Sequence, residues 1–276
     1  MIEELEIVSI RKIKNHINKS KKMYDLETEK NHNFFANGIL VHNSGTNFRD
    51  DGNDMMINAT CGNKCFDLSS KVLIQNGWLI KPQIKFIEKY MQTNDVKKLE
   101  NKILKGLINE TPEYNNFYEH FISNNDKRNM VIKEIIDQNK DKKILVLTRL
   151  VDHGQYLTAL INGSKHLHGQ TSKKEREKIF DAFTNGDLNI LISTISIFAE
   201  GIDLPNLKIV INAAANKGNV KTIQVLGRIL RKLEGKNTAQ YYDFIDETKF
   251  FRLASLARKK ALIKQGHEIE MIKNFI

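Results

Sequence analysis

The tripeptide His42-Asn43-Ser44 combines three side chains that could cleave and rejoin a peptide bond. The side-chain amide of Asn43 can attack its own backbone carbonyl, which would form a succinimide and break the bond to Ser44. The imidazole of His42 can polarise that carbonyl and protonate the leaving amine near neutral pH. The hydroxyl of Ser44 is a nucleophile that would accept an upstream segment as an ester. These residues predict a self-processing junction between positions 43 and 44.

Residues 23–44 resemble the C-terminal end of an intein. The resemblance rests on the ordered run HNFFANGILVHNS and on Asp25 and His32, which stand where inteins keep an acid and a second histidine. It implies that these two residues assist thioester exchange and asparagine cyclisation, and that residues 1–43 form a small, β-hairpin-rich Hint fragment. The alternative is an ordinary β-hairpin around Asn37-Gly38, followed by His-Asn-Ser by chance. An intein end is itself a hairpin, so both interpretations predict two strands here.

The intein resemblance also implies a partner chain. The first half of an intein carries an N-terminal cysteine or serine and a Thr-x-x-His block. Only residues 1–22 precede the motif, and they read as one alternating strand and a basic turn. We therefore expect a split intein, in which a separate chain supplies the other half and the two splice in trans. A fragment of a larger contiguous precursor is the alternative.

A second group of residues could bind a nucleotide. Arg228 and Arg231 are three residues apart in a predicted helix and would share one face, with Gln224 one turn earlier. Two guanidinium groups on such a face can reach a γ-phosphate across a cleft and stabilise transition-state charge. Upstream, Gly201 permits close backbone approach, and Asp203 could accept a ribose hydroxyl or orient Arg231. A solvated helix face with salt bridges is the alternative for the arginines.

The segments that carry these residues resemble motifs V and VI of superfamily 2 helicases, in the wording of XPB-like and phage UvsW-type DNA helicases. Motif V is TISIFAEGIDLP, residues 194–205, and motif VI is QVLGRILR, residues 224–231. Leu-Thr-Arg149 resembles motif IV, and His168-Gly169 resembles the loop after it. Thr194 and the loop amides that follow it suit a nucleic-acid phosphate. The ATP-binding residues that the resemblance implies are Gly201, Asp203, Gln224, Arg228 and Arg231, with the two arginines as arginine fingers. The nucleic-acid-binding residues that it implies are Arg149, His168, Gly169 and Thr194.

The segment directly after the junction resembles motif III of the same helicases. It reads SGTNFRDDG, with Ser44-Gly45-Thr46 in place of the usual Ser-Ala-Thr. The resemblance implies that these three residues couple ATP hydrolysis to strand movement. A polar surface loop is the alternative.

The helicase resemblance implies ATP and Mg²⁺ as cofactors, bound mainly by another lobe. It assigns the phosphate-binding loop and the Asp-Glu pair that holds Mg²⁺ to the first lobe, and no Gly-x-Gly-Lys-Thr sequence occurs here. We therefore expect a chain of these 276 residues to have no ATPase activity by itself.

The intervening sequence predicts a parallel α/β domain that positions these motifs. Apolar strands alternate with helices from residue 142 onward, as in doubly wound sheets. Ligands of such sheets bind outside the carboxyl ends of the strands. The predicted strands are 144–148, 166–169, 188–193, 207–212 and 239–245. The predicted helices are 127–140 with Asp126 as cap, 152–162, 173–183 with a Ser172/Glu175 capping box, 219–232 and 249–266.

Four segments are therefore expected. They are a C-terminal intein segment (1–43), the end of a first RecA-like lobe from motif III onward (44–90), a connector between lobes (91–125) and a second RecA-like lobe (126–276). The run WLIKPQIKFIE, residues 78–88, reads as the last strand of the first lobe.

The composition is that of a globular protein with a basic surface. It is 41% hydrophobic and 28% charged, with a net charge of +10 and no apolar run that approaches the length of a membrane span. Cys61 and Cys65 give no disulfide framework and indicate a reducing, cytoplasmic location. The basic excess suits DNA as a partner, although solvated lysines would also explain it.

Three functions remain open at this point. The expected one is a trans-splicing precursor that delivers the second lobe of an ATP-dependent DNA helicase. The alternatives are a lobe that binds nucleic acid and never splices, and a self-cleaving element whose downstream part is incidental.

Overall fold

The computed structural model divides the chain into two compact units, one with residues 1–47 and 54–64 and the other with residues 48–53 and 65–276. The described residues are 33–36, 39–42, 70–91, 93–105, 113–199, 204, 206–216, 219–232, 235–248 and 251–273.

The first unit contributes a β-hairpin. Its strands β1 (Asn33–Ala36) and β2 (Ile39–His42) pair antiparallel, and the register joins Ala36 to Ile39. Only Asn37 and Gly38 stand between them in the sequence, a pair typical of two-residue hairpin turns. The predicted hairpin is confirmed, and it is the feature on which the intein and hairpin interpretations agree.

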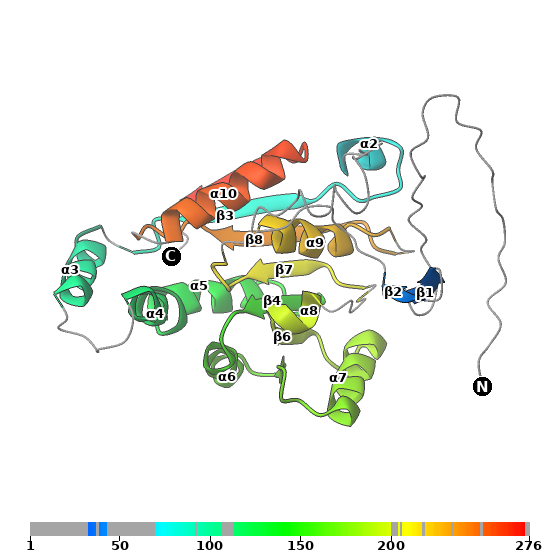
Figure 1. The fold of residues 1–276 in the computed structure, drawn as a ribbon, viewed down its shortest axis with the longest axis horizontal. Helices are drawn as coiled ribbons and strands as arrows, with labels where there is room; N and C mark the ends of the chain where they lie inside the picture. The colour runs from blue at the N-terminus through cyan, green and yellow to red at the C-terminus, as the bar shows by residue number, and fades with distance from the viewer. Residues whose placement is uncertain are drawn as a thin grey trace. The chain divides into compact units, whose positions relative to one another are not determined.

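The second unit is built on one parallel sheet of seven strands in the order β5-β6-β4-β7-β8-β3-β9 (Figure 1). Each neighbouring pair runs parallel, which confirms the predicted α/β class. The strands are β3 (Gln83–Glu88), β4 (Ile144–Thr148), β5 (Ser164–Leu167), β6 (Ile190–Thr194), β7 (Ile209–Asn212), β8 (Gln240–Phe244) and β9 (Ile269–Lys273).

Helices cover both faces of this sheet. Along β4, Ile144 and Val146 pack into one buried cluster and Leu145 and Leu147 into the other, because successive side chains of a strand point to opposite faces. Neither face meets water, so the central strands are apolar at almost every position. On the Ile144 face lie α5 (Asp126–Asp137) and α6 (Val151–Leu160), and on the Leu145 face lie α7 (Lys173–Asn185), α9 (Asn219–Ile229) and α10 (Phe251–Lys264).

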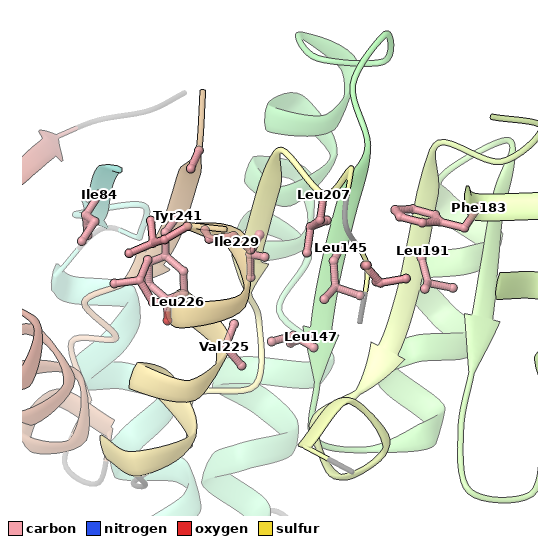
Figure 2. Packing of buried hydrophobic residues seen from close by; sticks show 14 of the residues in the cluster. Ile84, Leu145, Leu147, Phe183, Leu191, Leu207, Val225, Leu226, Ile229 and Tyr241 are labelled. Atoms are coloured by element: carbon pink, nitrogen blue, oxygen red, sulfur yellow. The ribbon is translucent and has the colours of Figure 1, made fainter. Parts of the chain in front are cut away.

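The packing of α9 matters most for the site, because this helix carries motif VI. Figure 2 shows its side chains Val225, Leu226 and Ile229 between Tyr241 of β8 and Leu145 of β4. All five side chains are almost fully buried. Burying one such aliphatic side chain contributes about 1.5–3 kcal/mol, so these contacts fix α9 on the sheet.

β3, which we expected to end the first lobe, belongs to this sheet. Ile84 pairs with Tyr241 of β8 and with Ile269 of β9, and Ile84 and Phe86 are buried in the Leu145-face core. The strand therefore lies in the second lobe's sheet and not at the end of a first lobe. Its apolar pattern marks it as a strand but carries no information about which sheet it joins. The edge strand β9 was not predicted, since its half-exposed residues lack a continuous apolar run.

The described residues of the segment expected to connect two lobes are mostly helical, and they pack on this lobe. They form α3 (Thr93–Leu104), α4 (Glu113–Tyr118) and a π-helical turn η1 (Glu119–Ser123). Phe117 and Phe121 stack with ring centroids 5.6 Å apart, and Tyr118 meets Phe251 of α10 edge to face at 5.8 Å. These contacts make a third buried cluster beside the sheet.

The helix ends follow local capping chemistry, but the cap of α5 lies one residue before the predicted position. The side chain of Ser172 accepts a hydrogen bond from the Glu175 amide at 3.3 Å, as the capping box predicts. Asn125, and not Asp126, caps α5 by accepting from the Arg128 amide at 3.1 Å. The other short helices are α2 (Ser70–Gln75) and α8 (Ile195–Ala199).

Two helix glycines should respond oppositely to alanine. A Cβ on Gly154 of α6 would come within 2.1 Å of His166 Nε2, whereas a Cβ on Gly227 of α9 meets no described atom within 4 Å. We expect Gly154→Ala to lower the free energy of unfolding by about 1–3 kcal/mol through overpacking. Gly227→Ala should raise it by up to about 1 kcal/mol, because alanine favours the helix. Denaturant unfolding of both variants measures this, and an equal gain in both would contradict the His166 placement.

Acid should destabilise the fold through His153. The side chain is buried against Asn129 Oδ1 at 2.9 Å, and burial, with the Arg128 charge, lowers its pKa to about 3. In the unfolded chain its pKa is about 6.5, so below that pH the unfolded state binds the extra proton and stability falls until the folded pKa is passed. We expect a loss of about 2 kcal/mol between pH 7 and pH 5 from this group.

The control for this pH effect is His153→Gln, which can still donate to Asn129 but does not titrate. Its unfolding free energy should fall less than that of the wild type over the same pH range. His166, whose pKa burial and His168 lower to about 4, stays in both proteins, so the difference isolates His153. Parallel pH curves for the two proteins would contradict the assignment.

Candidate nucleotide and nucleic-acid site

The register of the sheet brings the predicted nucleic-acid-binding residues to the edge that is formed by the carboxyl ends of its strands. Thr148, the last residue of β4, pairs with Thr194, the last residue of β6. Arg149 directly follows β4, and His168 directly follows the neighbouring strand β5. Three adjacent strands therefore present these residues at their carboxyl ends, where ligands of open parallel sheets bind.

Arg149 is exposed but held in place by two tyrosines of α4. Its Nη1 donates a hydrogen bond to the Tyr114 hydroxyl at 2.9 Å. The guanidinium carbon lies 5.1 Å from the Tyr114 ring centroid and 4.9 Å from that of Tyr118. Such cation–π contacts orient a guanidinium while leaving its other N–H groups available. The side chain can therefore meet a phosphate from the solvent side.

The other predicted contacts on this edge differ in access. His168 closes a short loop, because its amide donates to Thr171 Oγ1 at 3.1 Å and the Thr171 amide donates to its carbonyl at 3.0 Å. Gly169 is exposed within that loop. Thr194 is only 4% exposed, and its Oγ1 accepts from the Ser196 hydroxyl at 3.4 Å. The Thr194 hydroxyl is therefore engaged inside the protein, unlike the Arg149 guanidinium.

The motif VI residues are distributed differently from the prediction. Gln224 and Arg228 lie one turn apart on α9 and are half-buried. Arg231 lies beyond the last helical residue and forms an antiparallel bridge to Leu79. The prediction that Arg228 and Arg231 share one helix face is therefore wrong.

The early end of α9 comes from a distant segment. The Ile80 amide donates to the Leu230 carbonyl at 2.9 Å, and Lys232 Nζ donates to the Gly77 carbonyl at 3.3 Å. These hydrogen bonds hold residues 230–232 against residues 77–80, so the helix ends at Ile229. Arg231 stays exposed at this turn.

Gly227 lies between these polar positions on an exposed part of α9. Glycine inside a helix costs about 1 kcal/mol relative to alanine, and no described atom would touch a Cβ at this position. Packing among the described residues therefore does not require this glycine. Its missing side chain leaves room for close approach by a group from outside this lobe.

A buried ion pair anchors the chain at the start of α9. Asp243 of β8 accepts from Arg258 Nε at 2.9 Å and from Arg258 Nη2 at 2.8 Å, and both side chains are fully buried. Asn212, Tyr241 and the Phe244 amide add three more donors to this carboxylate, at 3.0, 3.0 and 2.7 Å. Burial lowers the pKa of the Arg258 guanidinium, but the charge and hydrogen bonds of Asp243 outweigh it and raise that pKa above its usual value.

A second buried pair lies beside the first. Arg128 Nε donates to Asp246 Oδ1 at 2.9 Å, and the Tyr90 hydroxyl donates to the same oxygen at 2.7 Å. The Arg128 guanidinium also lies over the Phe244 ring at 4.2 Å. Removing one partner of such a pair leaves an uncompensated buried charge and typically costs about 3–5 kcal/mol.

Both arginines reach the loop that links β7 to α9. Arg128 Nη1 donates to the Ala213 carbonyl at 3.0 Å, and Arg258 Nη1 donates to the Asn216 carbonyl at 2.7 Å. Between them, the Tyr118 hydroxyl donates to the Ala214 carbonyl at 2.9 Å. Three side chains from α4, α5 and α10 thus fix the backbone that leads into motif VI.

Sequence reasoning missed these positioning residues. Arg128, Asp243, Asp246 and Arg258 look like ordinary surface charges of helices and strand ends in the sequence. A signal was present for Asp243, which stands between the aromatic residues Tyr242 and Phe244 of a strand, where a buried carboxylate needs a partner. No comparable signal identifies which arginine provides it.

Several predicted site residues lie outside the described part of the chain. They are Asp25, His32, Asn43, Ser44, Gly45, Thr46, Gly201 and Asp203, and for His42 only the backbone strand is described.

Among the described residues, no group of three or more His, Cys, Asp or Glu side chains could hold a metal ion. Within the same residues, no helix has the length and apolar character needed to cross a bilayer.

Comparisons with known proteins agree with this architecture. The family described as "Helicase conserved C-terminal domain" matches residues 126–232. Putative helicase 22 of Sulfolobus islandicus filamentous virus is 28% identical over 218 residues, which cover 76% of this chain and 38% of that protein. DNA 3'-5' helicase XPB of Mycobacterium tuberculosis is 25% identical over 226 residues, 81% of this chain and 39% of that protein.

A solved structure shows the same fold. The crystal structure of T4 UvsW matches with a TM-score of 0.50 and 16% identity, over 71% of this chain and 42% of that chain. In sequence, the phage T4 protein is 29% identical over 100 residues, 35% of this chain and 20% of that protein. The chain spans about two fifths of the length of the viral and mycobacterial relatives. The predicted resemblance to XPB and UvsW helicases is confirmed, and residues 126–232 match the conserved C-terminal domain of helicases.

Proposed function

We propose that this chain supplies the second motor lobe of an ATP-dependent DNA helicase. The observation that carries the proposal is the arrangement at one edge of the sheet. Arg149 and His168 directly follow β4 and β5, and Thr194 ends β6, the strand between them. The loop after β7 leads from the same edge into the helix of Gln224 and Arg228. One lobe thus holds a candidate nucleic-acid surface and a candidate nucleotide surface on a common rigid sheet.

In this proposal the basic residues act by position and charge. Arg149 and the loop of His168 and Gly169 contact the DNA backbone, as phosphate contacts fix register without reading sequence. Arg228 and Arg231 face a nucleotide held by a first lobe and stabilise negative charge there. ATP and Mg²⁺ would supply the phosphoryl group and its charge neutralisation when bound.

The described lobe has features that fit a nucleotide at this place. Gly227 leaves open space on α9, and the exposed Arg231 lies at the turn just beyond the helix. For Gly201 and Asp203 we propose the roles that the motif V resemblance implies, close backbone approach and contact with a ribose hydroxyl. DNA is favoured over RNA because the mycobacterial relative is named a DNA 3'-5' helicase. A cytoplasmic location belongs to the same proposal.

The binding half of the proposal can be tested on the 276-residue chain. Arg149→Ala should weaken binding of a fluorescent single-stranded dT oligonucleotide and lower the slope of log affinity against log salt by about 0.7. The matched control is Lys264→Ala, which removes an exposed charge at the end of α10 and should leave affinity and slope unchanged. Equal effects of the two variants would contradict a specific role for Arg149.

The nucleotide half needs residues 44–276 joined to a lobe with a phosphate-binding loop. There, Arg228→Ala or Arg231→Ala should lower the DNA-stimulated ATPase rate by about 10³-fold or more, as loss of an arginine finger does, without weakening DNA binding. DNA-stimulated ATP hydrolysis by the purified 276-residue chain alone would refute the requirement for a second lobe.

We further propose that residues 1–43 are an intein segment that is removed at the Asn43–Ser44 bond. The order of Asp25, His32, His42, Asn43 and Ser44 in the sequence supports this proposal. The hairpin of β1 and β2 is compatible with it, as it is with an ordinary hairpin. Its register pairs Asn33 with His42, the neighbours in sequence of His32 and Asn43. A separate chain with the other intein half and the first lobe would be the splicing partner. The competing proposal is a lobe that binds nucleic acid and keeps its first 43 residues.

Mass spectrometry of the protein from its native cells tests the junction. We expect a product whose sequence continues from an upstream segment directly into Ser44, because Asn43 cyclisation releases the intein segment. Asn43→Ala should abolish this product, while Asn47→Ala, a change of the same kind beyond the junction, should not. Continued release from the Asn43→Ala protein would remove the proposed chemistry.

A further inference from the structure

Tyr118 touches both candidate surfaces. It is the last residue of α4 and only 2% exposed. Its ring centroid lies 4.9 Å from the guanidinium carbon of Arg149, at the candidate nucleic-acid surface. Its hydroxyl donates to the Ala214 carbonyl at 2.9 Å, in the loop that leads into α9. Among the side chains shown to hold that loop, Tyr118 is the one in contact with an exposed cationic group.

The loop that Tyr118 holds has little freedom of its own. Ala213 and Asn216 are tied by fully buried arginines on either side of Ala214. Ala215 is buried with a φ of 48°, which is costly for a residue with a Cβ. Ala214 therefore has little room to move by itself, and a change in its hydrogen bond would act on the whole stretch from residue 213 to residue 216.

The Tyr118 contacts have unequal strength. Burial raises the pKa of the Tyr118 phenol, so the hydroxyl remains a protonated donor to Ala214. The Arg149 contact, in contrast, lies at an exposed guanidinium, where cation–π attraction is weak and competes with any phosphate. A DNA phosphate that binds the Arg149 guanidinium would therefore weaken its contact with the Tyr118 ring, while the Tyr118 hydroxyl stays bonded to the Ala214 carbonyl.

We propose that Tyr118 is a positioning residue that couples occupation of Arg149 by a nucleic-acid phosphate to the backbone before motif VI. The proposal rests on the DNA-binding role given above to Arg149. By linkage, if DNA bound at Arg149 changes the affinity for a nucleotide at α9 through this residue, the nucleotide changes the affinity for DNA by the same factor.

Hydrogen exchange of the 276-residue chain, with and without a saturating single-stranded dT oligonucleotide, tests the coupling. In the wild type, DNA should change the exchange rates of amides within residues 211–222 by about fivefold or more. Tyr118→Phe keeps the ring beside Arg149 and removes only the hydroxyl. It should bind the oligonucleotide within about twofold of wild type and lose the loop response.

Tyr114→Phe is the matched control. It removes the hydroxyl that accepts from Arg149 Nη1 but leaves the Tyr118–Ala214 bond in place. This variant should bind DNA more weakly, yet at saturation it should show the wild-type loop response. A loss of response in both variants would mean that any disturbance of α4 has this effect, and would overturn the specific role of Tyr118.

If Tyr118→Phe does not fold, a further variant tests the same coupling without changing the buried Tyr118 hydroxyl. Arg149→Lys keeps the positive charge for a phosphate but lacks the planar group that stacks on the ring. It should bind DNA more weakly than the wild type, and at a saturating concentration of the oligonucleotide it should lose the loop response. A wild-type response in Tyr118→Phe or Arg149→Lys overturns the inference while leaving the proposed function intact. Absence of oligonucleotide binding by the wild type overturns the proposed DNA surface itself.

Discussion

The pairing of Asp243 with Arg258, and of Asp246 with Arg128, holds the functional edge of the sheet together. Buried charges are costly, and here each carboxylate accepts hydrogen bonds from its arginine and from a tyrosine hydroxyl. Replacing such a pair by apolar residues can be neutral for stability, so its value lies in geometry. Arg128 also donates one hydrogen bond to the Ala213 carbonyl, and Arg258 donates one to the Asn216 carbonyl, both in the loop before α9. The pairs thereby join α5, β8 and α10 to the backbone that carries motif VI.

This arrangement separates a rigid framework from exposed reactive groups. The sheet, its two helical layers and the buried pairs leave the candidate ligand-binding side chains on the outside, at Arg149 and Arg231. In the proposed function, such a lobe provides charge and positioning to a nucleotide that another lobe holds. The open space at Gly227 is consistent with a close approach from outside.

The strands and helices of the second lobe were accessible from the sequence because both follow local rules. The apolar run 144–148 coincides with β4, and the Ser172 capping box opens α7 as expected. Errors occurred where a distant segment changed a local outcome. Leu230 and Arg231 leave the helix because residues 79 and 80 bond to them, and β3 joins a sheet whose other strands lie mostly far along the chain.

For the candidate site, the sequence by itself determined the identity and order of the motif residues and the sheet edge at which Arg149, His168 and Thr194 meet. That much follows from strand periodicity and from the rule that parallel strands end together. Tertiary structure alone decided which side chains hold those residues: the tyrosines of α4 around Arg149 and the buried arginines around the β7–α9 loop. The physical reason is that a buried charge or hydroxyl takes its partner from whichever element the fold brings within about 3 Å, and sequence separation places no limit on that choice.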